Sequence, residues 1–401
     1  MSKRFYILTI LIAVSLILAA CGGGSQAPEQ CADNPDETVC AVIEPGSTIK
    51  IGYAGPMTGD YSAFGIDISN AELMAVDDLN AAGGLEGFEY ELLVEDTQGS
   101  PELGAAVANK YVSDPGVVAI AAHTFSGSTA AAIPIYAEAL RPMLSPSATG
   151  ADLTMNQTVF NRIAFTDTVQ GQFAGEYIKN VLGVEKLAVL HDGDVYGKGL
   201  AEKVQDVFTT LGGEVVAIQA ITQGDADYSA VLTDVGASNP EAIYFGGYYS
   251  DAAILAKDMP VAGLEDVILF SDDGTFGAAF IELAGDQAEG VYATSAAAQG
   301  SPRVNEFGER FEAIYGDPPG AVSTFTWHGY DVIMALVDRI KSVAILGEDG
   351  NLYIPRQALV DAVNGLEGYE GLTGDITCTE GECNTTGPTF WRVEDGEWVQ
   401  D

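Results

Sequence analysis

The feature that most constrains this chain is a repeated alternation of short apolar runs with longer amphipathic stretches, beginning at Thr48. The runs are rich in β-branched residues, as in IKIGYA (49–54) and YELLVE (90–95), which is typical of strands. The stretches between them show the apolar spacing of helices. Strand and helix in strict alternation indicate a parallel sheet with helices on both faces, so we expect an α/β protein.

The alternation occurs in two series, the second of which resumes after Asp167. The first is expected to contain strands 49–54, 90–95 and 117–121 and helices 70–82 and 101–112. The second is expected to contain strands 186–191, 215–220 and 242–245 and helices 170–182, 199–210, 228–238 and 251–258. Two such series are too large for one sheet, and a hydrophobic content of 47% is enough to build two cores. They therefore predict two lobes.

The N-terminal segment has the features of an export signal. Lys3 and Arg4 precede an apolar run and small residues, so residues 1–20 are expected to be a signal peptide. LAAC (18–21) resembles the lipobox of bacterial lipoproteins, in which Cys21 becomes the lipid-bearing N-terminus. The apolar run is too short for the ~20 residues of an uncleaved membrane-spanning helix. Residues 21–45, rich in Gly, Pro, Asn and acidic side chains, predict a lipidated tether.

Four further cysteines lie in two pairs that are close in sequence. They allow three connectivities, of which local pairing of Cys31 with Cys40 and of Cys378 with Cys383 is the most economical. Disulfides agree with an extracytoplasmic location. A zinc site is the alternative, but the pairs lack the C-x-x-C spacing of zinc ligands.

Charge and motifs narrow the function classes. The chain has 17 basic and 58 acidic residues, a formal net charge of −41, which repels nucleic acid and anionic lipid headgroups. It has neither a Gly-x-Ser-x-Gly nucleophile turn nor a Gly-x-x-x-x-Gly-Lys-Ser phosphate loop. None of its three histidines is a good metal ligand. We therefore expect no catalytic residues, no cofactor, no metal and no nucleic-acid partner.

The loops after the predicted strands are where a ligand should bind, because open α/β sheets bind ligands beyond the carboxyl ends of their strands. The first loop, 55–65, is punctuated by glycine and carries two aromatic residues. The loops 123–129 and 144–149 are rich in hydroxyl groups, and the former precedes the helical stretch 130–140. Hydroxyls and free amides at a helix N-terminus suit an anion, so the two turns favour one carboxylate between them.

Over residues 48–398 the chain resembles type I periplasmic binding proteins of the branched-chain amino acid (leucine/isoleucine/valine-binding) family. The resemblance is carried by GPMTG (55–59), NAAGG (80–84), SGST (126–129), SPSAT (145–149), HDGDVYG (191–197), YFGGYY (244–249) and DDG (272–274). It implies two doubly wound parallel-sheet lobes with a ligand cleft between them, joined by three crossings near Thr166, Ser295 and Gly347. Lobe 1 would then comprise 46–166 and 296–346, and lobe 2 would comprise 167–295 and 347–401.

The resemblance also implies the ligand-binding residues. Ser126 and Thr149 would donate to the carboxylate of an amino acid, helped by backbone groups of Ser147 and Ala148. An aromatic wall and two closing tyrosines would be Phe64, Tyr196 and Tyr248. Asp273 would hold the ammonium group, and its neighbour Asp272 is expected to face solvent.

The sequence departs from the family pattern at three places. Asp273 stands where branched-chain binders carry Glu, with a side chain one methylene shorter. Gln98 and Phe125 lie near the positions of the family's first-lobe disulfide, and Phe125 would reshape the side-chain pocket. The ligand could thus be leucine, another neutral amino acid, a small amide or urea.

These features together predict the function. The chain is expected to be a monomeric, lipid-anchored, extracytoplasmic substrate-binding protein that closes its lobes on a small amino acid for an ABC importer permease. A ligand-sensing module is one alternative, because the same fold serves receptors. An amidohydrolase-type enzyme using Ser126, His123 and Asp273 is the other, but Ser126 is better used as a hydrogen-bond donor.

The anchor generates a direct prediction. Wild-type protein should partition with the membrane fraction, whereas Cys21→Ala should accumulate unprocessed or be released in soluble form. Fractionation followed by immunoblotting measures this. Equal membrane partitioning of mature protein that lacks Cys21 would remove the lipoprotein assignment.

Overall fold

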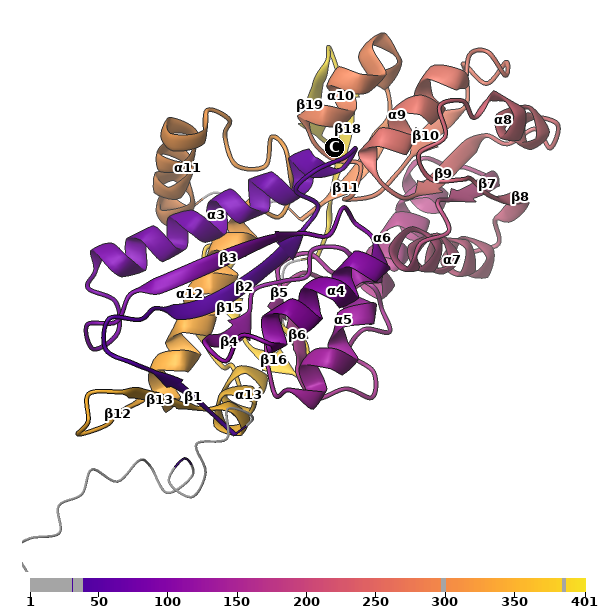
Figure 1. The fold of residues 1–401 in the computed structure, drawn as a ribbon. Coiled ribbons are helices and arrows are strands. Elements are labelled where there is room, and N and C mark those ends of the chain that lie inside the picture. Colours follow the sequence, from indigo (N-terminus) through magenta and orange to yellow (C-terminus); the bar gives the residue numbers. More distant parts are fainter. Residues whose placement is uncertain (1–30, 32–38, 297–300, 384–386) are drawn as a thin grey trace, which may run out of the picture.

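The computed structural model describes residue 31 and residues 39–296, 301–383 and 387–401. The predicted signal peptide 1–20, the lipidation site Cys21 and most of the tether lie outside the described residues. The described chain forms two lobes, each built on a seven-stranded, mostly parallel sheet (Figure 1). The predicted two-lobed α/β architecture is therefore confirmed.

The sheet of the first lobe is parallel except at one edge. Its strand order is β16-β17-β6-β5-β4-β2-β3. The strands are β2 (Ile49–Gly55), β3 (Tyr90–Asp96), β4 (Val117–Ile120), β5 (Met143–Ser145), β6 (Phe160–Arg162), β16 (Cys378–Thr379) and β17 (Glu382–Cys383). Only β16 runs antiparallel to its neighbour, as half of a tight hairpin with β17.

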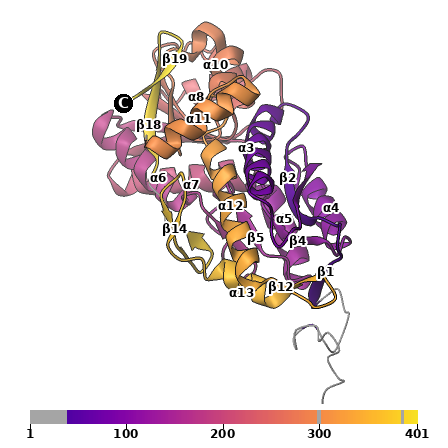
Figure 2. The same cartoon turned by 90° about the vertical axis from the view of Figure 1, so that its left-hand side faces the viewer.

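Helices cover both faces of this sheet, as the β-α-β alternation requires. The long helix α3 (Ser62–Ala81) packs against α12 (Thr326–Val343), and α4 (Pro101–Val112) packs against α5 (Ser126–Glu138). The two pairs lie on opposite faces (Figure 2). Both helix layers bury apolar side chains against the sheet, whose strands β2, β4, β5 and β6 are almost fully buried, and this burial stabilises the layered arrangement.

The second lobe repeats the plan with the strand order β19-β18-β11-β10-β9-β7-β8. Its strands are β7 (Lys186–His191), β8 (Glu214–Ala220), β9 (Ala242–Gly246), β10 (Ile268–Phe270), β11 (Tyr292–Ser295), β18 (Thr389–Glu394) and β19 (Glu397–Gln400). Its helices are α6 (Asp167–Glu176), the π-helical turn η1 (Tyr177–Val181), α7 (Val195–Thr210), α8 (Ser229–Gly236), α9 (Tyr249–Asp258), α10 (Ala278–Ala284) and the 3₁₀ turn η2 (Gly285–Ala288). The edge strands β18 and β19 are antiparallel to each other because a two-residue turn with positive φ at Asp395 and Gly396 joins them. Strand β18 also runs antiparallel to β11.

The assignment of 347–401 to the second lobe, with a crossing at Gly347, is wrong. The chain enters the second lobe between β6 and α6 and returns to the first lobe between β11 and α11 (Pro302–Tyr315), which packs on α3. It then stays in the first lobe through β17, which pairs with β6. Only the last strands, β18 and β19, join the second sheet. The third crossing therefore lies between Cys383 and Thr389.

Apolar packing explains why residues 352–383 remain in the first lobe. Strand β13 (Leu352–Pro355) pairs with β1 (Cys40–Ile43) and with the short β12 (Ile345–Leu346). Helix α13 (Arg356–Asn364) follows, and the two-stranded ribbon of β14 (Tyr369–Glu370) and β15 (Asp375–Ile376) precedes the hairpin. Leu352, Leu359 and Val363 are buried in the core that also contains Ile49 and Leu336. Their sequence pattern alone does not say which of two similar cores they enter.

The N-terminal tether is shorter than predicted. Residues 40–43 of the expected 21–45 tether form β1, whose Ala41 and Ile43 are buried in the first lobe. Cys31 is disulfide-bonded to Cys40, and Cys378 is bonded to Cys383 across the β16–β17 hairpin. Both local pairs thus occur in the structure, and neither pair is a zinc site.

Two helices of the first lobe begin earlier than their sequence pattern predicts. Helix α5 begins at Ser126 rather than at residue 130, so the hydroxyl-rich segment is its first turn and not a preceding loop. Helix α3 begins at Ser62 rather than at residue 70. There Gly65 lies against the preceding loop, and a Cβ on it would sit 2.1 Å from the carbonyl oxygen of Pro56.

None of the helices in the described ranges is long and apolar enough to cross a membrane. No group of three or more His, Cys, Asp or Glu residues in that part of the chain is arranged to hold a metal ion.

The close approach at Gly65 predicts that Gly65→Ala destabilises the protein. The added methyl group must displace Pro56 or α3, which is expected to lower the free energy of unfolding by ~1–3 kcal/mol. Gly199→Ala in α7 is the control, because its Cβ would meet no atom within 4 Å and should leave stability unchanged or slightly higher. Denaturant unfolding followed by circular dichroism measures both. Equal midpoints for Gly65→Ala and wild type would contradict the packing.

Candidate functional site

Six of the eight residues predicted to contact a ligand meet at one small cavity between the lobes. The lining residues are Phe64, Thr124, Phe125, Ser126, Ser147, Tyr196, Tyr248, Asp273 and Gly274. The cavity measures about 10 Å³, which is room for about one water molecule. Larger hollows of about 370 and 540 Å³ contain none of the eight predicted residues. The small cavity, which residues of both lobes line, is therefore the candidate site.

The first-lobe side of this cavity is built around the N-terminus of α5. The first amides of a helix have no intrahelical acceptor and carry the positive end of the helix dipole. Ser126, the first residue of α5, accepts a hydrogen bond at Oγ from the backbone N–H of Gly150 at 3.1 Å. Its hydroxyl proton remains available for a second partner. This arrangement can bind an anion such as a carboxylate.

The remaining first-lobe residues of the prediction are used differently. Ser147 lines the cavity, but its hydroxyl donates to the carbonyl oxygen of Thr124 at 2.9 Å. The amide of Ala148 donates to Ser145 Oγ at 3.0 Å, within the same turn. Ala148 and Thr149 lie outside the cavity lining. Thus Ser126 lines the cavity with its hydroxyl hydrogen available to a ligand. The hydrogen bonds of Ser147 and Ala148 instead stabilise the turn.

Aromatic rings from both lobes close over the cavity. Phe125 and Tyr248 stack with centroids 4.1 Å apart and planes 7° apart. Phe64 packs edge-on against Phe125 at 5.6 Å, and Tyr61 lies 5.2 Å from Tyr248. Tyr61 also donates a hydrogen bond across the lobes to Asp251 at 3.1 Å. Stacked and edge-on rings exclude water. Phe125 lines the cavity and reduces the space left for a ligand side chain.

The second-lobe side of the cavity presents a carboxylate. Asp273 follows β10, and its Oδ1 accepts hydrogen bonds from the hydroxyl of Tyr196 at 2.8 Å and from the side-chain amide of Gln170. Gln170 donates in turn to Thr294 Oγ1 at 2.6 Å. These contacts hold the carboxylate in a fixed orientation at the cavity wall.

The expectation that Asp272 faces solvent is wrong. Its side chain is fully buried, and its two oxygens accept hydrogen bonds from the amides of Gly247 at 3.0 Å and Gly274 at 3.1 Å. Asp272 therefore ties the loop after β9 to the loop after β10. Loop amides supply a buried carboxylate with the hydrogen bonds that water would otherwise provide, which explains why this acid turns inward.

Buried acids give the cavity an unusual electrostatic environment. Burial raises the pKa of Asp273 to about 6, although hydrogen bonds from Tyr196 and Gln170 lower it. Burial raises the pKa of Asp167 to about 8, and the nearby charge of Asp273 adds to the shift, while Thr149 and the more distant positive charge of Arg162 lower it. Burial also raises the pKa of Asp272. A cation placed among these groups would favour their ionised forms.

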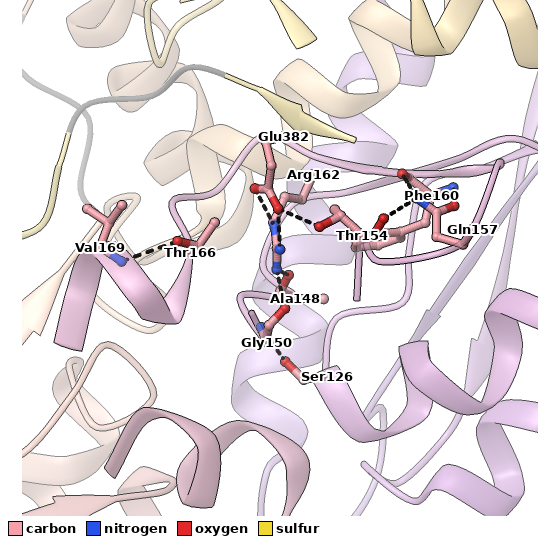
Figure 3. Close-up of polar contacts among 10 residues, drawn as sticks. All are labelled: Ser126, Ala148, Gly150, Thr154, Gln157, Phe160, Arg162, Thr166, Val169 and Glu382. Carbon is pink, nitrogen blue, oxygen red and sulfur yellow. Dashed lines mark hydrogen bonds and ion pairs between the residues drawn. The ribbon is translucent and has the colours of Figure 1, made fainter. Parts of the chain in front are cut away.

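Sequence reasoning missed two polar groups at this side of the site, Asp167 and Gln170. Thr166 caps α6 by accepting the amide of Val169 at 3.2 Å (Figure 3), and a Thr-Asp pair before a helical stretch is a recognisable start signal. The position of Asp167 beside the site depends on tertiary structure, because its backbone amide donates to the carbonyl oxygen of Thr149 at 2.9 Å.

Known proteins resemble this chain over most of its length. The periplasmic binding protein family matches residues 48–396. A leucine-, isoleucine-, valine-, threonine- and alanine-binding protein of Pseudomonas aeruginosa is 33% identical over 73% of this chain and 78% of its own length.

Two solved structures share the fold. A leucine binding protein from Thermotoga maritima has a TM-score of 0.80 at 26% identity, covering 88% of this chain and 98% of its own. A branched-chain amino acid transporter substrate-binding protein from Streptococcus pneumoniae, in complex with isoleucine, has a TM-score of 0.78 at 26% identity, covering 88% of this chain and all of its own. The resemblance seen in the sequence motifs is confirmed.

The raised pKa of Asp167 predicts a specific pH dependence of stability. With a folded pKa of about 8 and an unfolded pKa of ~3.9, the native state keeps a proton that the unfolded chain releases. This group therefore makes stability fall as pH rises from about 4 to about 8. Asp167→Asn cannot ionise and should lose less stability than wild type between pH 5 and pH 8, measured by thermal unfolding.

Asp206→Asn, on the exposed surface of α7, removes the same charge away from the site and serves as the control. If Asp167→Asn and wild type lose the same stability between the two pH values, the carboxyl group of Asp167 is not buried in its neutral form.

Proposed function

Because the chain belongs to the periplasmic binding protein family, we propose that it is the substrate-binding component of an ABC importer and holds a small neutral amino acid between its lobes. The observation that carries the proposal is the opposition of two groups across one cavity. The N-terminus of α5 with Ser126 lies on one side, and the buried carboxylate of Asp273 lies on the other. An α-amino acid carries the two complementary charges on neighbouring atoms.

The carboxylate of the ligand is assigned to the first lobe. There Ser126 offers a hydroxyl proton, and the first amides of α5 offer further donors. Both groups stabilise an anion, as does the positive end of the helix dipole. Thr149, predicted from the sequence as a second donor, would need to turn from its place beside Asp167 to reach the ligand.

The ammonium group is assigned to Asp273. Moving an ammonium group from water into a cavity closed by Phe64, Tyr196 and Tyr248 is costly unless a fixed anion replaces its hydration. Asp273 is held by Tyr196 and Gln170 in the cavity wall. Asp167 adds a second negative charge close by once it is ionised. The ligand's own positive charge would stabilise both carboxylates.

The side chain of the ligand would lie against aromatic rings. Phe64, Phe125 and Tyr248 form an apolar wall without a charged group at its centre, which favours a neutral side chain. The relatives agree with this assignment, since one is named for binding leucine, isoleucine, valine, threonine and alanine and another was solved with isoleucine. The space of about 10 Å³ requires the lobes or the Phe125–Tyr248 stack to open before a ligand enters.

The cellular setting completes the proposal. Cys21 would carry the lipid that anchors the protein to the outer face of the cell membrane, and the chain would deliver its ligand as a monomer to permease subunits. The supporting observations are the signal-peptide-like pattern of residues 1–20 and the lipobox-like LAAC sequence. A ligand-sensing role would use the same cleft, and the relatives named as amino acid-binding or transport proteins favour import.

An enzymatic role is disfavoured by the groups around Ser126. The Nε2 of His123 lies 3.2 Å from the hydroxyl of Tyr136, and burial lowers the pKa of His123 to about 3. Asp273 is engaged by Tyr196 and Gln170 on the other lobe. A nucleophilic serine requires a base within hydrogen-bond reach and a third group that orients this base. A small amide or urea remains the alternative ligand, because either would fit a short cavity.

The Asp273 assignment predicts that Asp273→Asn abolishes amino acid binding at micromolar ligand. Leaving an ammonium group buried without its anion costs ~3–5 kcal/mol, on the order of a hundredfold to several thousandfold in Kd. Isothermal titration calorimetry with L-leucine and L-alanine measures this, and Asp206→Asn is the charge-matched control on the exposed surface of α7.

Asn keeps the shape and the acceptor oxygen of Asp273, so the variant should fold. Retained affinity in Asp273→Asn would place the ammonium site elsewhere. Binding of acetamide or urea by both wild type and this variant, with no binding of amino acids, would replace the amino acid by the amide alternative.

A further inference from the structure

Behind the anion-binding side of the cavity lies a fully buried arginine that the sequence analysis did not single out. Arg162 is the last residue of β6, and its side chain has no exposed surface. Its Nη1 donates to the carbonyl oxygens of Ala148 at 3.0 Å and Gly150 at 2.6 Å. One edge of the guanidinium group therefore binds the carbonyl oxygens of the two residues that flank Thr149 in the turn.

The opposite edge of the same guanidinium group is held by Glu382. Arg162 Nε donates to Glu382 Oε2 at 3.0 Å, and Nη2 donates to Glu382 Oε1 at 2.6 Å. Thr154 Oγ1 also donates to Glu382 Oε1 at 2.7 Å. A two-point contact between guanidinium and carboxylate fixes the orientation of both planes as well as their distance. The position of Glu382 therefore sets the direction in which Arg162 presents its other edge.

Glu382 lies in the β16–β17 hairpin, whose strands contain only two residues each. Residues 380 and 381 both have positive φ and form its tight turn. The amide of Arg162 donates to the carbonyl oxygen of Gly381 at 3.0 Å, and Glu382 is in register with Arg162. A hairpin this short has little stability of its own. The Cys378–Cys383 disulfide joins the paired cysteines on its two strands and keeps them together.

The other end of this series of contacts reaches the ligand site. The carbonyl oxygen of Gly150 is held by Arg162, and the amide of Gly150 donates to Ser126 Oγ at 3.1 Å. Because that acceptor lone pair is occupied, the hydroxyl proton of Ser126 is directed away from Gly150. Figure 3 shows the continuous path from Glu382 through Arg162 and Gly150 to Ser126.

We propose that Arg162 and Glu382 are positioning residues for the anion-binding side of the site, and that the disulfide-closed hairpin 378–383 braces them. The hairpin lies more than two hundred residues along the chain from Ser126, yet it determines how Ser126 and the turn 148–150 face the ligand. The statement about ligand affinity rests on the proposed amino acid function. The statement about the turn rests on the contacts alone.

Two variants test the brace without removing the buried arginine. Glu382→Gln removes the charge and one of the two carboxylate oxygens that accept from Arg162, and the double variant Cys378→Ser/Cys383→Ser removes the disulfide. Their controls are Glu380→Gln, an exposed neighbour in the same turn, and Cys31→Ser/Cys40→Ser, which removes the other disulfide beside β13. Each control matches its test variant in chemistry.

The first readout is hydrogen–deuterium exchange of the segment 148–150 in the protein without ligand. Both test variants should exchange faster than wild type there, and both controls should exchange as wild type does. The second readout is the calorimetric Kd for L-leucine and L-alanine, which should rise by about tenfold in the test variants. Circular dichroism confirms that each variant is folded.

Unchanged exchange at 148–150 in both folded test variants would overturn the proposal. Faster exchange together with unchanged Kd would overturn the claim that the brace positions the ligand contacts. If wild type binds neither amino acid but the test variants still exchange faster, the brace stands and the amino acid function fails. The two conclusions can therefore be separated.

Discussion

The arrangement of the cleft depends on the free-energy cost of burying carboxyl groups. The side chains of three acids in the cleft region are buried, namely Asp167, Asp272 and Asp273. Each must obtain from the protein the hydrogen bonds that water would have supplied. Asp272 obtains it from the loop amides of Gly247 and Gly274. Asp273 accepts hydrogen bonds from two neutral side chains, Tyr196 and Gln170, and it lines the cavity, whereas Asp272 does not. The difference separates an acid that shapes the loops from an acid suited to bind a cation.

The opposite wall of the cleft solves the complementary problem, because a helix N-terminus must be kept ready for an anion without being filled by the protein's own acceptors. The turn 145–150 comes close to α5 but directs the carbonyl oxygens of Ala148 and Gly150 away from it, toward Arg162. Glu382 balances the charge of that arginine from the far side. The positive guanidinium group is thus used entirely within the first lobe, and the amides and hydroxyl of α5 remain for the ligand.

Between these walls the two lobes meet through aromatic rings, chiefly the stack of Phe125 on Tyr248. Ring contacts and single hydrogen bonds such as Tyr61 to Asp251 are modest individually. An interface of this kind can close without a covalent link and can open again when a ligand must enter or leave. Two sheets joined by three crossings suit a hinge motion, for which periplasmic binding proteins are a known example. The two-lobed fold therefore positions the binding groups on opposite sides of the cavity, Ser126 on the first lobe and Asp273 on the second.

Local sequence patterns are enough to predict the two α/β series, the family and the segments after strands that carry Phe64, Ser126, Tyr196, Tyr248 and Asp273, and they favour the local disulfide pairs, because period, spacing and motif order are local properties. Long-range packing in the folded protein places residues 352–383 in the first lobe, since their apolar pattern would fit either core. It also decided that Asp272 is buried and that Asp167 and Arg162 lie beside the site. Those roles depend on which distant groups fold against each residue, and no spacing along a single chain records the desolvation or the long-range hydrogen bonds that result.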